Sequence, residues 1–196
     1  EAKADELFRK ANTLEHMFDH RFYNPFCLHC VRGNSTRRYR KKGGLVLGPK
    51  PEEFGEQQSG DHLISRSKTA DGLEAADPED EWFPGAENAV VMYDRGTDLL
   101  WAYPTATRTE EDTTAAFLHW TKPGEVVESF YADNAPELQK AAKARKWRTP
   151  TSTPGVPKTN GLIERMVRRV KSGAKANLSQ SGLARKWWPY AMTHFC

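Results

Sequence analysis

The chain has 196 residues, which is enough for one sizeable domain and a small additional module, and its 38% hydrophobic content is ordinary for a globular protein. Three cysteines are too few for a secreted disulfide framework, and we find neither a membrane-spanning apolar run nor a signal peptide, so we expect an intracellular setting and no membrane partner. The net charge of +3 conceals an asymmetry: residues 1–50 carry 11 basic and 5 acidic groups, residues 51–100 carry 3 and 13, and residues 151–196 carry 8 and 1. Basic ends around an acidic middle suit a protein that grips a polyanion at its periphery and binds cations at its centre, although a solvated charge pattern would have the same composition.

The first segment, residues 2–20, is predicted to form one amphipathic helix. Leu7, Ala11, Leu14 and Phe18 fall on a single stripe at helical spacing, which is typical of a helix with one buried face. An Asn-Pro pair follows this segment and is expected to end the helix.

Two histidines and two cysteines in this region have the spacing of a zinc site. His16 and His20 are four residues apart, and Cys27 and Cys30 follow as a C-x-x-C pair. Two imidazoles and two thiolates suit a closed tetrahedral Zn²⁺ site, with His29 as a possible substitute ligand. The alternative is surface histidines beside a redox-active or merely reduced cysteine pair, but a thioredoxin-like motif would need a βαβ setting that is absent. We predict one structural Zn²⁺, because the segment is too small to fold on its own core.

A basic run follows the cysteines and leads into a linker rich in glycine and proline. Tyr39 lies within the run, where its ring is positioned to stack on a nucleic-acid base. The cationic residues that we expect to contact DNA here are Arg37, Arg38, Arg40, Lys41 and Lys42.

From about residue 60 the pattern changes to alternating strands and helices. Residues 66–87 are acidic and without periodicity, so they are predicted to be a surface loop, and Thr109 is expected to cap a helix whose first turn is acidic. The fold class is therefore α/β, with one central mixed sheet flanked by helices. The expected strands are 61–65, 87–94, 98–104, 125–133 and 146–149, and the expected helices are 109–120, 136–144, 161–178 and one from about residue 183.

Three acidic residues stand at positions typical of a metal site. Asp61 is near the start of a strand, Asp133 directly follows another, and Glu164 is in the first turn of a helix behind the proline-containing loop 149–160. Hard cations such as Mg²⁺ and Mn²⁺ need several carboxylates that converge from separate elements. The alternative is that the two aspartates cap strand ends and that Glu164 interacts with the helix dipole.

The helix over residues 161–178 has two contrasting faces. One face is apolar and is expected to pack on the core through Ile163, Val167, Val170, Ala174 and Leu178. The other face continues from Glu164 into cations that no acidic neighbour balances, which favours a DNA surface over a solvated face. The residues expected to contact DNA from this helix and the loop before it are Lys158, Asn160, Arg165, Arg168, Lys171 and Lys175.

Two motifs resemble the second half of a retroelement integrase catalytic core, with copia-type retrotransposon polyproteins as the closest in character. The motifs are YADNAPEL, which contains Asp133, and TPTSTPGVPKTNGLIERMVRRVK, which contains Glu164. SGDHL, which contains Asp61, is similar to the first catalytic strand of that family, and the His-His-Cys-Cys order is similar to its zinc-binding N-terminal module.

This resemblance implies a ribonuclease-H-like core over residues 54–196 behind a zinc module and basic linker over residues 1–45. It implies a two-metal-ion DNA strand transferase that joins retroelement DNA 3′ ends to target DNA, with Asp61 bridging two Mg²⁺ or Mn²⁺ ions and the other two acids completing one each. It also implies homo-oligomers, function in the nucleus and a chain cut at both ends from a longer polyprotein. The alternatives are an inactive or domesticated nucleic-acid-binding copy and a metal-dependent nuclease of the same fold.

Overall fold

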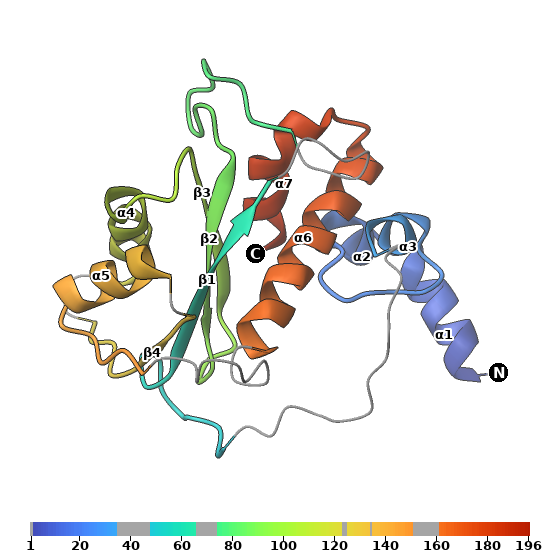
Figure 1. Ribbon diagram of the computed structural model, residues 1–196. Coiled ribbons are helices and arrows are strands. Elements are labelled where there is room, and N and C mark those ends of the chain that lie inside the picture. The colour runs from blue at the N-terminus through green and yellow to red at the C-terminus, as the bar shows by residue number, and fades with distance from the viewer. Residues whose placement is uncertain (1, 35–47, 66–73, 123–124, 134, 151–160) are drawn as a thin grey trace.

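The computed structural model describes residues 2–34, 48–65, 74–122, 125–133, 135–150 and 161–196, and places a mixed four-stranded sheet between two layers of helices (Figure 1). The strand order is β3-β2-β1-β4, with β1 and β2 antiparallel, β2 and β3 antiparallel, and β1 and β4 parallel. The strands are β1 (Gln58–Ile64), β2 (Asn88–Asp94), β3 (Leu100–Thr105) and β4 (Phe130–Tyr131).

The predicted strands are present, but their bounds differ. β2 is buried along its whole length, as expected for a central strand covered on both faces. β1 begins at Gln58, three residues earlier than predicted, because Gln58 pairs with Asp94 of β2 and Phe130 of β4. Its buried polar side chain accepts a hydrogen bond from the Trp120 indole at 2.8 Å. Of the strand expected over residues 125–133, only β4 is a strand, and the one expected over 146–149 is reduced to a single bridge between Arg148 and Ser129, which precedes β4.

Helices α4 (Glu110–Trp120) and α5 (Pro136–Ala144) cover one face of the sheet (Figure 1). As predicted, Thr109 caps α4: its hydroxyl accepts a hydrogen bond from the amide of Asp112 at 3.3 Å. A buried cluster from both helices and the sheet fills this side, including the three stacked or edge-on rings of Phe117, Phe130 and Trp147.

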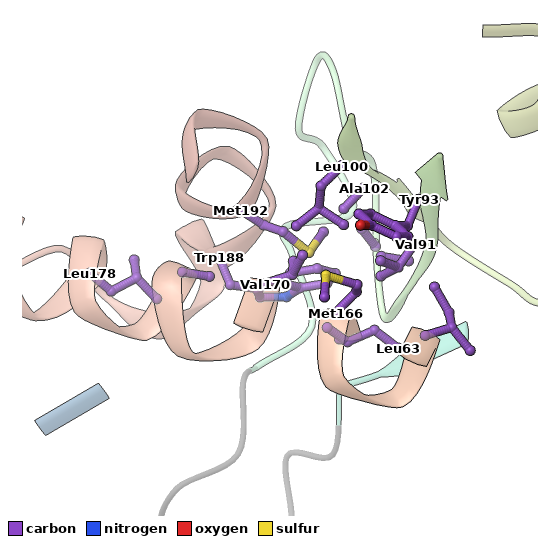
Figure 2. Close-up of a cluster of buried hydrophobic side chains, with 14 of the residues drawn as sticks. Leu63, Val91, Tyr93, Leu100, Ala102, Met166, Val170, Leu178, Trp188 and Met192 are labelled. Carbon is purple, nitrogen blue, oxygen red and sulfur yellow. The ribbon is translucent and has the colours of Figure 1, made fainter. Parts of the chain in front are cut away.

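The long helix α6 (Gly161–Ser181) and α7 (Trp188–Phe195) cover the other face, joined through a short 3₁₀ turn, η2 (Arg185–Trp187). Figure 2 shows the apolar core of this side, where Val170, Trp188 and Met192 meet Leu63 and Val91 of the sheet. The stripe predicted for α6 is confirmed, since its residues are buried apart from the half-buried Val167.

The N-terminal segment forms three short helices outside α6, not the single helix predicted over residues 2–20. They are α1 (Ala2–Ala11), α2 (Leu14–Asp19) and α3 (Leu28–Gly33). Thr13 has extended backbone angles and its hydroxyl caps α2, so the helical stripe is interrupted there. The predicted apolar stripe is consequently wrong beyond Ala11, because Leu14 is 83% exposed and Phe18 71% exposed. No helix within the described ranges combines the length and apolar character needed to cross a membrane.

Candidate metal centres

The four predicted zinc ligands come together in the N-terminal module. The ligand atoms of His16, His20, Cys27 and Cys30 all lie within 4.8 Å of one another. The Cys30 thiol lies 3.4 Å from Nδ1 of His20 and 3.5 Å from Nε2 of His16, and the Cys27 thiol lies 3.6 Å from Nδ1 of His20. The pattern read from the sequence is therefore a spatial cluster in which three of the four residues are buried.

Local structure explains why these residues converge. His16 is in α2, and His20 caps its C-terminal end in a left-handed conformation, with φ 53°, which turns the chain back. Cys27 is the N-cap residue of α3 and Cys30 lies in its first turn, so both thiols point to the same side. Asn24 fixes the connecting loop, because its side chain donates to the Leu7 carbonyl at 2.7 Å and accepts from the Phe26 amide at 2.9 Å.

The chemistry of this cluster fits Zn²⁺. Burial lowers the pKa of both His16 and His20, which favours the neutral imidazole that binds a metal. Burial, with the neighbouring Cys27, raises the pKa of Cys30 to about 11, so the thiolate needs a cation close by. His29 is not part of the group: its Nδ1 lies 3.0 Å from the hydroxyl of Ser179.

Asp61 lies on β1, and Asp133 lies just beyond the end of the neighbouring strand β4. Parallel pairing aligns Gln58 with Phe130 and Ser59 with Tyr131, and each aspartate follows the second of these aligned pairs by two residues. Side chains alternate along a strand, so Asp61 is on the same face as Leu63, which packs under α6. Asp61 therefore faces the layer that contains Glu164.

Electrostatics connects the three acids. Burial, together with the charges of Asp133 and Glu164, raises the pKa of Asp61 to about 6, against the opposing effect of the His62 amide, which donates to its carboxylate at 2.7 Å. Asp133 is fixed by the Ala135 amide, which donates to its carboxylate at 2.9 Å.

Glu164 is less enclosed than Asp61. It is exposed in the first turn of α6. Across the part of the chain that the structure describes, only the histidines and cysteines above form a group of three or more candidate metal ligands, so the carboxylates are neighbours without being gathered at one point. Carboxylate oxygens are nevertheless the hard donors that Mg²⁺ or Mn²⁺ prefers.

The sequence did not draw attention to His62, which follows Asp61 and points to the opposite face. Its Nδ1 lies 4.0 Å from a carboxylate oxygen of Glu137 on α5, and its buried Nε2 has no hydrogen-bond partner among the described residues. Burial lowers the pKa of His62. A lone histidine inside a strand has no spacing signal, so only the structure reveals this pair.

Four of the predicted DNA-contacting residues lie on α6. Arg165 and Arg168 are exposed, and Lys171 and Lys175 are half-buried. Arg168 donates from its side chain to the Glu164 carbonyl at 3.3 Å. The remaining ones lie outside the described residues: Arg37, Arg38, Arg40, Lys41, Lys42, Lys158 and Asn160.

Comparison with known proteins identifies the fold. No protein-family model and no curated protein matches the sequence. The structure is similar to the HTLV-2 integrase catalytic core domain in complex with magnesium (trimeric form), with 16% identity, a TM-score of 0.50, and coverage of 75% of this chain and 86% of that one. It is also similar to a chain of the simian T-cell lymphotropic virus intasome in complex with PP2A regulatory subunit B56 gamma, with 18% identity, a TM-score of 0.53, and coverage of 84% and 55%.

A third structure, the catalytic core domain of BIV integrase, matches with 14% identity and a TM-score of 0.46 over 71% of this chain and 81% of that one. This chain spans about half the length of the intasome chain. The two matches with TM-scores of 0.53 and 0.50 confirm the predicted α/β fold with an integrase-like, ribonuclease-H-like core, and the His/Cys cluster agrees with the predicted zinc module.

Proposed function

We propose that this chain is the zinc module and catalytic core of an integrase, a polynucleotidyl transferase that joins the 3′ ends of retroelement DNA to target DNA. The observation that carries the proposal is the interaction of the buried Asp61 carboxylate with the charges of Asp133, just beyond β4, and Glu164, in the first turn of α6. Carboxylates from separate elements are the kind of donor set that a pair of divalent cations requires.

In the proposed mechanism Asp61, Asp133 and Glu164 would together hold two Mg²⁺ or Mn²⁺ ions. When bound, the ions would activate a water or a DNA 3′-hydroxyl and stabilise the leaving oxygen. The raised pKa of Asp61 supports a cation site, because a nearby positive charge would favour its ionised form. The rigid β1 strand and the Ala135 amide hold the two aspartates in place.

The DNA would lie along the polar face of α6. Arg165 and Arg168 are exposed within one turn of Glu164, which would place phosphates next to the reacting atoms. We further propose that the protein acts as a homo-oligomer in the nucleus and derives from a retrotransposon polyprotein. The His/Cys cluster would hold one Zn²⁺ with a purely structural role.

One observation favours a second candidate. Because Glu164 is exposed and the three carboxylates are not gathered into one group of the described residues, an inactive or domesticated copy that still binds DNA is the alternative. A nuclease of the same fold is the third.

A strand-transfer assay separates these functions. Paired DNA oligonucleotides with Mn²⁺ would give joined products for an integrase, cleavage without joining for a nuclease, and bound but unchanged DNA for an inactive copy. Asp133→Asn should abolish joining while keeping the oxygen that accepts from the Ala135 amide. The matched control is Asp77→Asn, which alters an exposed aspartate that pairs with Lys186 of η2.

A further inference from the structure

One side chain outside the predicted zinc ligands touches the cluster. The ring of His20 makes a short hydrogen bond through Nε2 to the side-chain oxygen of Gln180, in the last turn of α6. The opposite ring nitrogen, Nδ1, faces Cys27 and Cys30. His20 therefore presents one nitrogen to the cluster and the other to the helix that contains Glu164.

Helix α3 packs closely on α6, with Gly33 against the backbone of Ser172 and Ala176. A Cβ atom added at Gly33 would lie 2.7 Å from the Ser172 carbonyl oxygen and 3.1 Å from the Ala176 amide nitrogen, so this approach requires glycine. Next to Gln180, the Ser179 hydroxyl lies 3.0 Å from Nδ1 of His29. The module is thus packed on α6 through contacts that leave little room for adjustment.

The chemistry of imidazole links these contacts to the metal. A neutral ring has one N–H, and a nitrogen that binds a metal cannot keep its proton. If Nδ1 of His20 binds the metal, Nε2 must carry the proton and can donate it to Gln180. Without a metal the proton can reside on either nitrogen. A histidine ligand whose second nitrogen has a fixed acceptor is both oriented and made more basic.

We propose that Gln180 is a positioning residue of the zinc site, and that it couples Zn²⁺ binding to the docking of the N-terminal module on α6. The inference rests on the zinc site proposed above. Because the coupling is reciprocal, Zn²⁺ should strengthen the contact between the module and the end of α6, and loss of the Gln180 acceptor should weaken Zn²⁺ binding.

The affinity for Zn²⁺ tests the first half of the proposal. Competition against a chromogenic chelator is measured with the full chain for the wild type, Gln180→Met, Gln180→Glu and Ser179→Ala. Gln180→Met keeps the length of an exposed side chain but removes the acceptor, and should weaken Zn²⁺ binding by about 10- to 100-fold. Gln180→Glu keeps an acceptor and should restore wild-type affinity or exceed it. Ser179→Ala, which alters the same interface at His29, should leave the affinity unchanged.

Hydrogen exchange tests the second half. Adding Zn²⁺ should slow amide exchange in both α3 and residues 176–181 of the wild type, but only in α3 of Gln180→Met. The inference is overturned if Gln180→Met binds Zn²⁺ as the wild type does, if Ser179→Ala weakens binding equally, or if Zn²⁺ protects the end of α6 alike in both proteins. A wild type that binds no Zn²⁺ overturns the zinc site itself, which is a distinguishable result.

Discussion

Asp61 on β1 and Asp133 just beyond β4 each follow the aligned pair Ser59 and Tyr131 by two residues. The charge of Asp133 contributes to the raised pKa of Asp61, so the two carboxylates lie close enough to interact. The fold thus brings together two of the carboxylates that the proposed chemistry requires. The protonation of Asp61 is therefore the first property to test.

The stability of the protein without Mg²⁺ or Mn²⁺ should depend on Asp61 in a defined direction. Its pKa is raised from an ordinary 3.8 to about 6, so its stabilising contribution is complete below about pH 4 and is lost as the pH rises through 6. Asp61→Asn keeps an oxygen for the His62 amide but carries no charge. We expect equal unfolding free energies at pH 4 and a variant more stable by on the order of 1–3 kcal/mol at pH 8, measured by urea denaturation. A variant no more stable than the wild type at pH 8 would contradict the assignment.

The amount of bound zinc should depend on the four residues of the His/Cys cluster and not on the cysteine outside it. Cys30→Ser removes a buried thiol from the four-residue group, whereas Cys196→Ser alters a half-buried cysteine outside it. Elemental analysis should find about one Zn²⁺ per chain in the wild type and in Cys196→Ser, and almost none in Cys30→Ser. Cys30→Ser should also unfold at a lower temperature, because metal binding contributes to folding. Equal zinc content in all three proteins would exclude the site.

The packing of α7 on α6 depends on the absence of a side chain at Gly173. A Cβ atom there would lie 2.2 Å from Cδ2 of Phe195, so Gly173→Ala forces the ring to move. The expected cost is about 1–3 kcal/mol of unfolding free energy. In a Phe195→Ala background the same substitution should cost much less, since the obstructing ring is gone. Equal costs in both backgrounds, measured by chemical denaturation, would show that this contact does not set the helix spacing.

DNA affinity should depend on the exposed arginines of α6. Replacing Arg165 and Arg168 by Gln is expected to weaken binding and to reduce the salt dependence of log K by about 0.9 for each DNA phosphate that the protein no longer neutralises. Lys143→Gln is the control, because this exposed lysine is on α5, across the sheet from α6. Fluorescence anisotropy across a salt series gives both quantities. An equal slope in the arginine variant and the control would place the DNA elsewhere.

Much of the fold could be predicted from local patterns, because the relevant signals are short-range. The apolar run of β2, the Thr109 cap of α4 and the stripe of α6 each follow from neighbouring residues. The early start of β1 could not, since Gln58 joins the strand by pairing with Asp94 of β2 and Phe130 of β4, both distant in sequence. The break at Thr13 was missed because a continuous apolar stripe concealed a capping residue.

In the candidate site, too, features set by nearby residues could be predicted and features set by distant residues could not. The zinc ligands lie within 15 residues of one another, so their spacing was informative, and the structure brings them together. The partner of His20 could not be predicted, because Gln180 is 160 residues away and resembles any exposed helical glutamine. The relation between Asp61 and Asp133 depends on strand register, which sequence spacing does not specify.

Asp61, Asp133 and Glu164 are proposed to hold divalent metal ions jointly. Anomalous diffraction from crystals of the protein grown with Mn²⁺ tests this directly, because it locates each ion without reference to activity. We expect manganese peaks between the two aspartates, with Glu164 drawn to them from its exposed position in the first turn of α6. Crystals in which Mn²⁺ is absent from Asp61 and Asp133, or in which Glu164 stays in solvent while the ions bind elsewhere, would contradict it.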